Sequence, residues 1–346
     1  MQHVPAHVPP QYYSDYVWAL RHGDVTKVRD IVLALSAQGF TADQVIRDLI
    51  APGQREIGQA WGVAQLSVAQ EHQATVIAEE ALALLLDPQQ THPVQDQGEV
   101  VLCAAQDEWH SIAGRMVAVV WRHLGWRVRL VVPSVPAGDV AELIGDSDLT
   151  LAGVTCAMPA NIYGAWRMIS ALREHGCWVV VGGRGFGTGV RAEHCARRLG
   201  ADSYAADAAT AHRTLVYLRG LGVPGQRPGL DLGERGAEAT ALMRVRSGIV
   251  SDAVDVAQGL HPELLADGAA VRRARDDLSL LLRTAVAAML VDDPHIMRQH
   301  WIWYRELLAS SGADPGLGEG WVDALLRRLP TDAPHTRRVL ADVQPR

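Results

Sequence analysis

The sequence predicts a fold of class α/β plus α in three parts: an N-terminal four-helix bundle, a Rossmann-like doubly wound parallel sheet and a C-terminal all-α domain. Three observations support this prediction. Residues 12–87 carry apolar side chains at three- and four-residue spacings, and residues 98–222 alternate short β-branched runs with helical segments. A Gly- and Pro-rich stretch, Arg219–Gly236, then precedes further helical segments. The expected domains are 1–92, 98–222 and 236–346.

In the first part, the apolar spacing predicts helices at Tyr13–Arg21, Asp24–Gln38, Thr41–Ile50 and Gln65–Leu86. Asp24 suits an N-cap, and Thr41 with Gln44 forms a capping box. The segment APGQREIGQAWG, residues 51–62, is expected to be a turn that places Trp61 shortly before the last helix. Glu71 and His72 follow Trp61 after nine intervening residues.

In the second part, strands are expected at Val100–Ala105, Trp126–Val132, Leu149–Val154 and Cys177–Val181. Helices are expected at Ile112–His123, Val140–Ile144, Ile162–Glu174 and Ala192–Leu199. An open α/β sheet binds its ligands beyond the carboxyl ends of the strands. Three strands are followed there by candidate site residues: Glu108, His110 and Ser111 after the first, Thr155 and Ala157 after the third, and Gly182, Gly183 and Arg184 after the fourth.

His110 is the best candidate for a reactive centre. A histidine in such a loop can ligate a metal through one ring nitrogen, while a carboxylate such as Glu108 holds the proton of the other nitrogen and fixes the tautomer. Taken alone, a loop histidine is more often a solvated surface residue. The run GGRGFGTG that starts at Gly182 is not a dinucleotide fingerprint, because that fingerprint follows the first strand of its unit.

Together the three strand-end motifs resemble the cobalamin-binding fold, whose pattern is Asp-x-His-x-x-Gly, then Ser-x-Leu or Ser-x-Thr, then Gly-Gly. The resemblance implies that His110 is the lower ligand of cobalt, replacing the cofactor's own base. It also implies that the displaced nucleotide tail enters the sheet, lined by Thr155, Ala157, Gly182, Gly183 and Arg184. This chain departs from the pattern in having Glu108 for Asp, Thr155 for Ser, and Ala113 for Gly, with Gly114 one place later. The last change predicts a loop re-registered by one residue.

The spacing of Trp61, nine residues and Glu71-His72 resembles the helical bundle of CarH- and LitR-type photoreceptors, which sense light with adenosylcobalamin. The resemblance implies that Trp61 packs against the adenosyl group and that Glu71 and His72 lie over the upper corrin face. His72 would be able to ligate cobalt after illumination. Those regulators carry a winged-helix DNA-binding domain ahead of the bundle. Here the bundle begins close to Met1, so we expect no nucleic-acid binding by the protein itself.

The C-terminal part contains an amphipathic segment, Asp276–Leu290, and a segment rich in aromatic residues, Asp292–Leu308. The second segment places Trp301, Trp303 and Tyr304 beside His295 and His300, and a polar tail is expected after Leu329. These aromatic residues are compatible with an ordinary core. The arrangement of all three parts, however, is similar to the photocobilins, in which a helical domain binds a bilin such as biliverdin. The resemblance implies a second chromophore without a thioether link, because no cysteine follows Cys195.

Composition narrows the function classes. The net charge of −7 argues against a surface that binds nucleic acid. With no signal sequence and no membrane span evident, the expected location is cytoplasmic. A cobalamin-dependent isomerase would need a substrate barrel of about 250 residues. We therefore expect a light sensor rather than an enzyme, forming a light-dependent homo-oligomer with an unidentified downstream partner. The alternative is a corrinoid protein that shuttles methyl groups for a methyltransferase.

Overall fold

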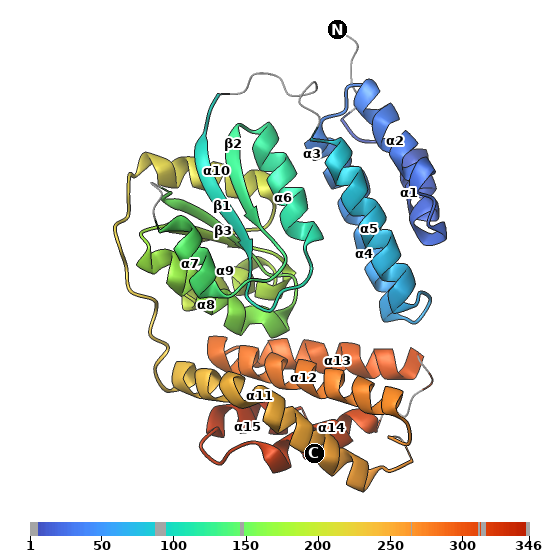
Figure 1. The fold of residues 1–346 in the computed structure, drawn as a ribbon, viewed down its shortest axis with the longest axis vertical. Coiled ribbons are helices and arrows are strands. Elements are labelled where there is room, and N and C mark those ends of the chain that lie inside the picture. Colours follow the sequence, from blue (N-terminus) through green and yellow to red (C-terminus); the bar gives the residue numbers. More distant parts are fainter. Residues whose placement is uncertain are drawn as a thin grey trace.

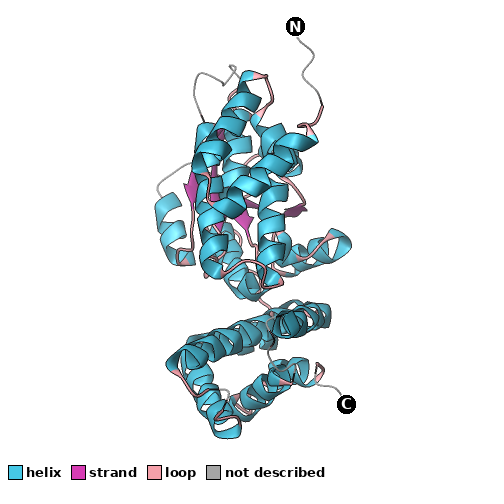
Figure 2. Cartoon of the chain, turned by 90° about the vertical axis from the view of Figure 1, so that its right-hand side faces the viewer, coloured by secondary structure: helices cyan, strands magenta, loops and turns pink. Residues whose placement is uncertain are grey.

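The computed structural model describes residues 6–86, 95–145, 149–263, 265–310, 312 and 316–343, and it confirms the predicted fold class. A helical bundle lies beside a parallel sheet with its helices, and a C-terminal helical region lies below both (Figure 1). In the side view of Figure 2 the bundle lies in front of the sheet, and the C-terminal helical region lies below. Among the described residues, no helix is long and apolar enough to cross a membrane. The predicted domain limits at 1, 92 and 346 lie outside the described residues.

The bundle is built from α1 (Pro10–His22), α2 (Val25–Ala37), α3 (Ala42–Val45), the π-helical turn η1 (Ile46–Ile50), α4 (Ala51–Gly62) and α5 (Val68–Leu84). Asp24 caps α2 by accepting from the backbone N–H of Lys27. The capping box of Thr41 and Gln44 is also present. Both predicted helix starts are therefore confirmed.

The prediction of a turn over residues 51–62 was wrong, because α3, η1 and α4 form one continuous rod. Pro52 lacks an N–H and would ordinarily break a helix. It follows a wider π turn, in which the N–H of Ala51 bonds to the carbonyl of Ile46, and such turns accommodate interruptions of the regular ladder. Gly53 lets the rod approach Tyr16, since a Cβ there would stand 2.7 Å from the ring. Trp61 therefore lies on the last turn of a helix.

The sheet is parallel, with strand order β2-β1-β3-β4-β5. Its strands are β1 (Gly98–Ala104), β2 (Trp126–Val131), β3 (Leu151–Thr155), β4 (Trp178–Gly182) and β5 (Ser203–Ala205). The strand order reverses direction between β1 and β3, which is the switch point where such sheets bind ligands. Ala104 pairs with Thr155 there, so the loops that follow β1 and β3 leave the sheet side by side. The topology thus brings the first two predicted motifs together.

Helices cover both faces of the sheet. They are α6 (Ile112–His123), α7 (Ala137–Ile144), η3 (Pro159–Asn161), α8 (Ile162–Glu174), η4 (Arg184–Phe186), α9 (Gly189–Arg198) and α10 (Ala208–Gly220). Ala118 and Trp121 of α6 pack on the sheet, with α10 on the same face. Val119 and Val120 of α6 belong instead to the core of the bundle. This helix therefore lies between the sheet and the bundle (Figure 1).

The C-terminal region consists of α11 (Gly233–Leu260), α12 (Gly268–Val291), α13 (Pro294–Ser310), α14 (Leu317–Arg328) and α15 (Pro334–Ala341). The prediction of a polar tail after Leu329 was wrong, because α15 packs its Leu340 fully into the core. Glu238 of α11 holds the start of α15 by accepting from the backbone N–H groups of His335 and Thr336, at 3.2 and 2.7 Å. A carboxylate at a helix N-terminus also complements the helix dipole.

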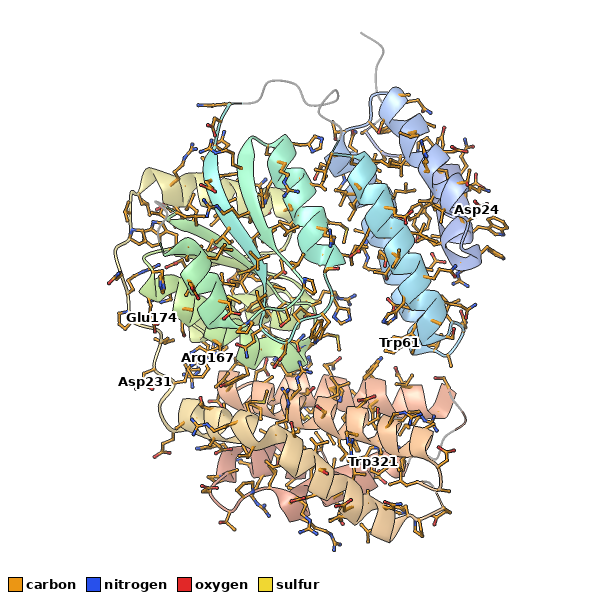
Figure 3. All side chains as sticks on the ribbon, in the orientation of Figure 1. Asp24, Trp61, Arg167, Glu174, Asp231 and Trp321 are labelled. Atoms are coloured by element: carbon orange, nitrogen blue, oxygen red, sulfur yellow. The ribbon has the colours of Figure 1, made fainter. Side chains whose placement is uncertain are left out.

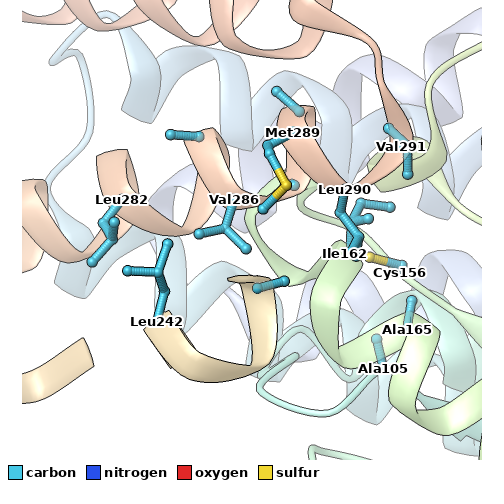
Figure 4. Close-up of a cluster of buried hydrophobic side chains, with 14 of the residues drawn as sticks. Ala105, Cys156, Ile162, Ala165, Leu242, Leu282, Val286, Met289, Leu290 and Val291 are labelled. Atoms are coloured by element: carbon cyan, nitrogen blue, oxygen red, sulfur yellow. The ribbon is translucent and has the colours of Figure 1, made fainter. Parts of the chain in front are cut away.

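The sheet and the C-terminal region share one continuous apolar core. Figure 4 shows Ala105, Cys156, Ile162 and Ala165 of the sheet part close to Leu290 and Val291 of α12, and all belong to a single buried cluster. The stretch before α11 is also anchored, since Arg227 donates to Asp202 at 2.5 Å and to the carbonyl of Cys177 at 2.6 Å. The C-terminal region is therefore fixed against the sheet.

Candidate cofactor-binding site

The loop after β1 holds His110 through the buried carboxylate of Glu108, which is only 1% exposed. Oε1 of Glu108 accepts from His110 Nδ1 at 2.5 Å and from the His110 backbone at 3.1 Å. Oε2 accepts from the backbone N–H groups of Ala157 and Met158 and from Asn161 Nδ2, at 2.8, 3.1 and 2.8 Å. The loop after β3 thus fixes the carboxylate, and the carboxylate fixes the histidine.

Electrostatics supports this arrangement. Burial alone would raise the pKa of Glu108, but the hydrogen bonds and charge of His110 outweigh it and hold that pKa below its usual value. The hydrogen bond to Glu108 raises the pKa of His110, burial opposes this, and the charges of Glu108 and then Glu71 add to the rise. Because Nδ1 is engaged with Glu108, Nε2 is the nitrogen left to bind a metal. The His110 side chain is 56% exposed, so a ligand can approach it.

Trp109 lies between these two residues and was missed by the sequence analysis. Its side chain is 72% exposed, although a tryptophan gains by covering its apolar surface. An exposed indole beside an exposed imidazole, both at the carboxyl edge of a parallel sheet, offers an apolar surface next to a nitrogen that can bind a metal. The only signal in the sequence was the position of Trp109 inside the motif, in a loop expected to be exposed.

The bundle reaches this loop through α5, which packs along α6. Ser111 donates to Glu79 of α5, and Arg115 Nε lies 3.2 Å from the same carboxylate. Glu71 lies two helical turns, about 12 Å, further along α5. Its charge contributes to the raised pKa of His110, which places it on the His110 side of the bundle. The structure therefore brings Glu71 and His110 towards one region.

Trp61 and His72 lie further from His110. Figure 3 shows Trp61 at the end of the bundle that faces the C-terminal helices, where its ring lies 6.4 Å from that of Trp303 on α13. The His72 side chain is 73% exposed, and its Nδ1 lies 2.9 Å from the carbonyl of Val68 and 2.8 Å from Glu71. These contacts leave the Nε2 atom of His72 directed away from its own helix backbone.

The residues expected to line a nucleotide tail lie at and after the ends of β3 and β4. The hydroxyl of Thr155 donates to the carbonyl of Cys103 at 3.5 Å. A Cβ on Gly114 would stand 3.0 Å from Val132 and 3.6 Å from the Thr155 hydroxyl. The close approach therefore falls at Gly114 rather than at Ala113, as expected for a loop re-registered by one residue.

Packing within the protein itself explains why residues 182 and 183 are both glycine. Gly183 has φ +106°, and a Cβ there would overlap with the carbonyl of Cys156. A Cβ on Gly182 would stand 2.9 Å from the carbonyl of Ala205. Both glycines are thus required by neighbouring backbone, and a role in lining a tail stays a prediction. Arg184 is exposed at the start of η4, and Ala157 acts through its backbone N–H to Glu108.

Comparison with known proteins agrees with this geometry. Residues 13–86 match the family described as the B12 binding domain. The HTH-type transcriptional repressor CarH of Myxococcus xanthus is 31% identical over 120 residues, which are 35% of this chain and 38% of that protein. The chain thus matches less than two fifths of the length of this relative.

Among solved structures, the monomethylamine corrinoid protein of Methanosarcina barkeri superposes with a TM-score of 0.52 at 17% identity, over 61% of this chain and 100% of that one. At this identity the likeness shows the fold alone. The family match to the bundle and the Rossmann-like sheet beside it agree with the arrangement of Glu108 and His110 in the loop after β1. The chain therefore carries a B12 binding domain over residues 13–86, and its cofactor is a corrinoid.

Proposed function

We propose that this protein is a light sensor that uses adenosylcobalamin, with His110 as the lower ligand of cobalt. The observation that carries the proposal is the position of Trp61 at the end of the bundle that faces the C-terminal helices (Figure 3), together with Glu71, whose charge acts on His110. The similarity to the CarH repressor supports it. Adenosylcobalamin supplies a weak, light-sensitive cobalt–carbon bond, so the protein needs to hold the cofactor and respond to its change rather than perform chemistry.

Each residue has a defined task in this proposal. His110 offers Nε2 to cobalt, while Glu108 keeps the proton on Nδ1. Trp61 offers a broad apolar surface against which the adenosyl group packs and from which water is excluded. His72 offers an imidazole, a side chain suited to a transition metal, on the same helix as Glu71. It is the candidate upper ligand once the adenosyl group has left.

The second candidate function is a corrinoid carrier of methyl groups, supported by the fold shared with the monomethylamine corrinoid protein. That likeness spans all of the monomethylamine corrinoid protein but only 61% of this chain. A carrier has to open its upper face to a partner enzyme in every cycle. Here Trp61 packs against Trp303 of α13, so the C-terminal region holds this end of the bundle in place. This contact favours the sensor.

Absorbance spectra of the full chain loaded with adenosylcobalamin, before and after green light, test the proposal. We expect a spectral change together with a shift in elution on size-exclusion chromatography, because departure of the adenosyl group changes what the bundle packs against. Methyl transfer from methylcobalamin to a thiol acceptor is the control reaction. An unchanged spectrum after illumination would exclude the sensor.

Trp61→Ala is expected to lower the preference for adenosylcobalamin over methylcobalamin. An aromatic contact contributes about 1 kcal/mol beyond area burial, so the ratio of the two dissociation constants should fall about fivefold or more. Trp18→Ala is the matched control, because Trp18 is exposed on α1 and stacks on His22 instead. Equal weakening of both cofactors in Trp61→Ala would contradict packing against the adenosyl group.

We also propose a bilin, such as biliverdin, as a second chromophore bound near α13. Trp301 and Tyr304 are buried in the C-terminal core, where Tyr304 binds Asp277 and Trp321, so they are not free to form pocket walls. Trp303 and His300 remain, and burial lowers the pKa of His300 to about 4, which keeps its ring neutral. These two rings lie 5.4 Å apart, and the Trp303 ring lies 6.4 Å from that of Trp61.

Co-expression of the full chain with a biliverdin source should give a red absorbance band. Trp303→Ala should reduce that band at least severalfold, whereas Ile302→Ala, at an exposed position on the same helix, should retain it. The full chain is required because a truncation before α11 would expose the apolar face that packs on α12. Equal bands in both variants would place the bilin elsewhere.

A further inference from the structure

His110 is connected to the C-terminal region by a chain of hydrogen bonds whose central link, between Asn161 and Glu108, is buried. Arg283 of α12 donates to the side-chain oxygen of Asn161. The amide nitrogen of Asn161 donates to Glu108 at 2.8 Å, and Glu108 accepts from His110 Nδ1 at 2.5 Å. Arg283 therefore fixes the orientation of the Asn161 side-chain amide. Because the amide oxygen accepts from the guanidinium, the amide nitrogen is the atom that faces the Glu108 carboxylate.

The same helices hold the backbone of the loop. Asp107 adopts φ +68°, in the left-handed region that few non-glycine residues adopt, although aspartate does so more readily than most. Arg246 of α11 lies 3.2 Å from its carboxylate, and Arg283 reaches its carbonyl at 3.5 Å. Ser134 accepts from its backbone N–H at 2.7 Å. Two arginines of the C-terminal region, Arg246 and Arg283, thus hold the loop that carries His110 through Asp107.

The positive charge of Arg283 also acts on the Glu108 carboxylate, in addition to its hydrogen bond to Asn161. Burial lowers its pKa and the charge of Asp107 opposes this, yet an arginine stays protonated in proteins. A fixed positive charge near Glu108 weakens the pull of the carboxylate on the Nδ1 proton of His110, and so sets how strongly Nε2 donates to a metal. Arg283 does not contact the Glu108 carboxylate directly, because Asn161 lies between the two charged groups.

We propose that Arg283 is a positioning residue for the cobalt ligand: through Asn161 it fixes the Glu108 carboxylate, and thereby the tautomer and donor strength of His110. The C-terminal region and the lower face of the cofactor are then one connected unit. The expected effect of Arg283 on cobalt binding rests on the proposed role of His110 as the ligand. The expected effect of Arg283 on the His110 tautomer does not.

The first test uses the full chain without cofactor, labelled with nitrogen-15 histidine, at alkaline pH where the ring is neutral. His110→Ala assigns the resonances. The original protein should show one tautomer with the proton on Nδ1, whereas Arg283→Met should show averaging of two tautomers. Arg283→Lys, which keeps a charged donor, should restore the original pattern in part. Arg191→Met is the matched control, because Arg191 also bridges the sheet part to the C-terminal region, through Asp293 at 3.1 Å, without touching the loop.

The second test uses the same full-length variants loaded with Co(II) cobalamin. Arg283→Met should alter the nitrogen hyperfine splitting and weaken cobalamin binding by about 10-fold, the lower end of the effect of groups that support a metal ligand. Thermal unfolding of each variant shows that it is folded. An unchanged His110 tautomer in folded Arg283→Met would overturn the inference. A changed tautomer, with no nitrogen splitting even in the original protein, would support the relay and reject His110 as the ligand.

Discussion

His110→Ala is expected to abolish nitrogen ligation of cobalt from the lower side. His110 presents a free Nε2 at the carboxyl edge of the sheet, and alanine offers no donor in its place. The Co(II) form of the bound cofactor should therefore lose its nitrogen hyperfine splitting in electron paramagnetic resonance. Cobalamin affinity should fall by more than the roughly 10–100-fold expected when a supporting group such as Glu108 is replaced.

His123→Ala provides the control for this experiment. His123 lies at the other end of α6, and its ring nitrogen bonds to the carbonyl of Val119 in its own helix. It should leave both the splitting and the affinity as they were. If the splitting persisted unchanged in His110→Ala, another residue would have to be the cobalt ligand, and the loop after β1 would lose its proposed role.

Gly164→Ala is expected to have the largest effect on stability. Gly164 lies in the first turn of α8, and a Cβ there would overlap with the backbone carbonyl of Gln106 in the loop after β1. Backbone cannot swing aside as a side chain can, so either α8 or the loop must move. The free energy of unfolding should fall by about 3 kcal/mol or more. Because the loop carries Glu108, cobalamin binding should weaken as well.

Gly138→Ala is the matched control, since Gly138 also lies in a helix of the sheet part but a Cβ there meets nothing within 4 Å. Replacing a glycine with alanine inside a helix ordinarily stabilises by roughly 0.5–1 kcal/mol. Thermal and chemical unfolding of both variants therefore separate the general glycine effect from the close approach. A small, equal change in both would contradict the tight packing of α8 on the loop.

The sequence predicted best what short-range patterns determine. The bounds of α6 and α8 match the predicted helices, and Glu108 lies two residues from the histidine that it holds. The rod through residues 51–62 was missed because Pro52 is a strong local breaker, and its accommodation depends on the π turn before it. The strand β5 has only three residues, too few to give a period.

The rest of the site depends on topology, which a single sequence does not display. Asn161 reaches Glu108 only because β3 pairs with β1, and Arg283 reaches Asn161 across 122 residues of chain. No spacing rule joins residues so far apart. The aromatic segment of α13 illustrates the same limit, because Trp301 faces the core while Trp303 faces Trp61, although both lie within three residues.

Helix α6 can pass a movement of the His110 loop to the bundle, because it starts at that loop and packs on both the sheet and the bundle. This helix of 12 residues is about 18 Å long, with Ser111 and the His110 loop at its start and the cores of the sheet and bundle on opposite flanks. Packed interiors transmit displacement because they are dense. A tilt of about 5° pivoting at the loop would carry the far end through roughly 1.5 Å, by the length of the helix alone. A small tilt at the His110 loop would thus produce a larger displacement where α6 supports the bundle.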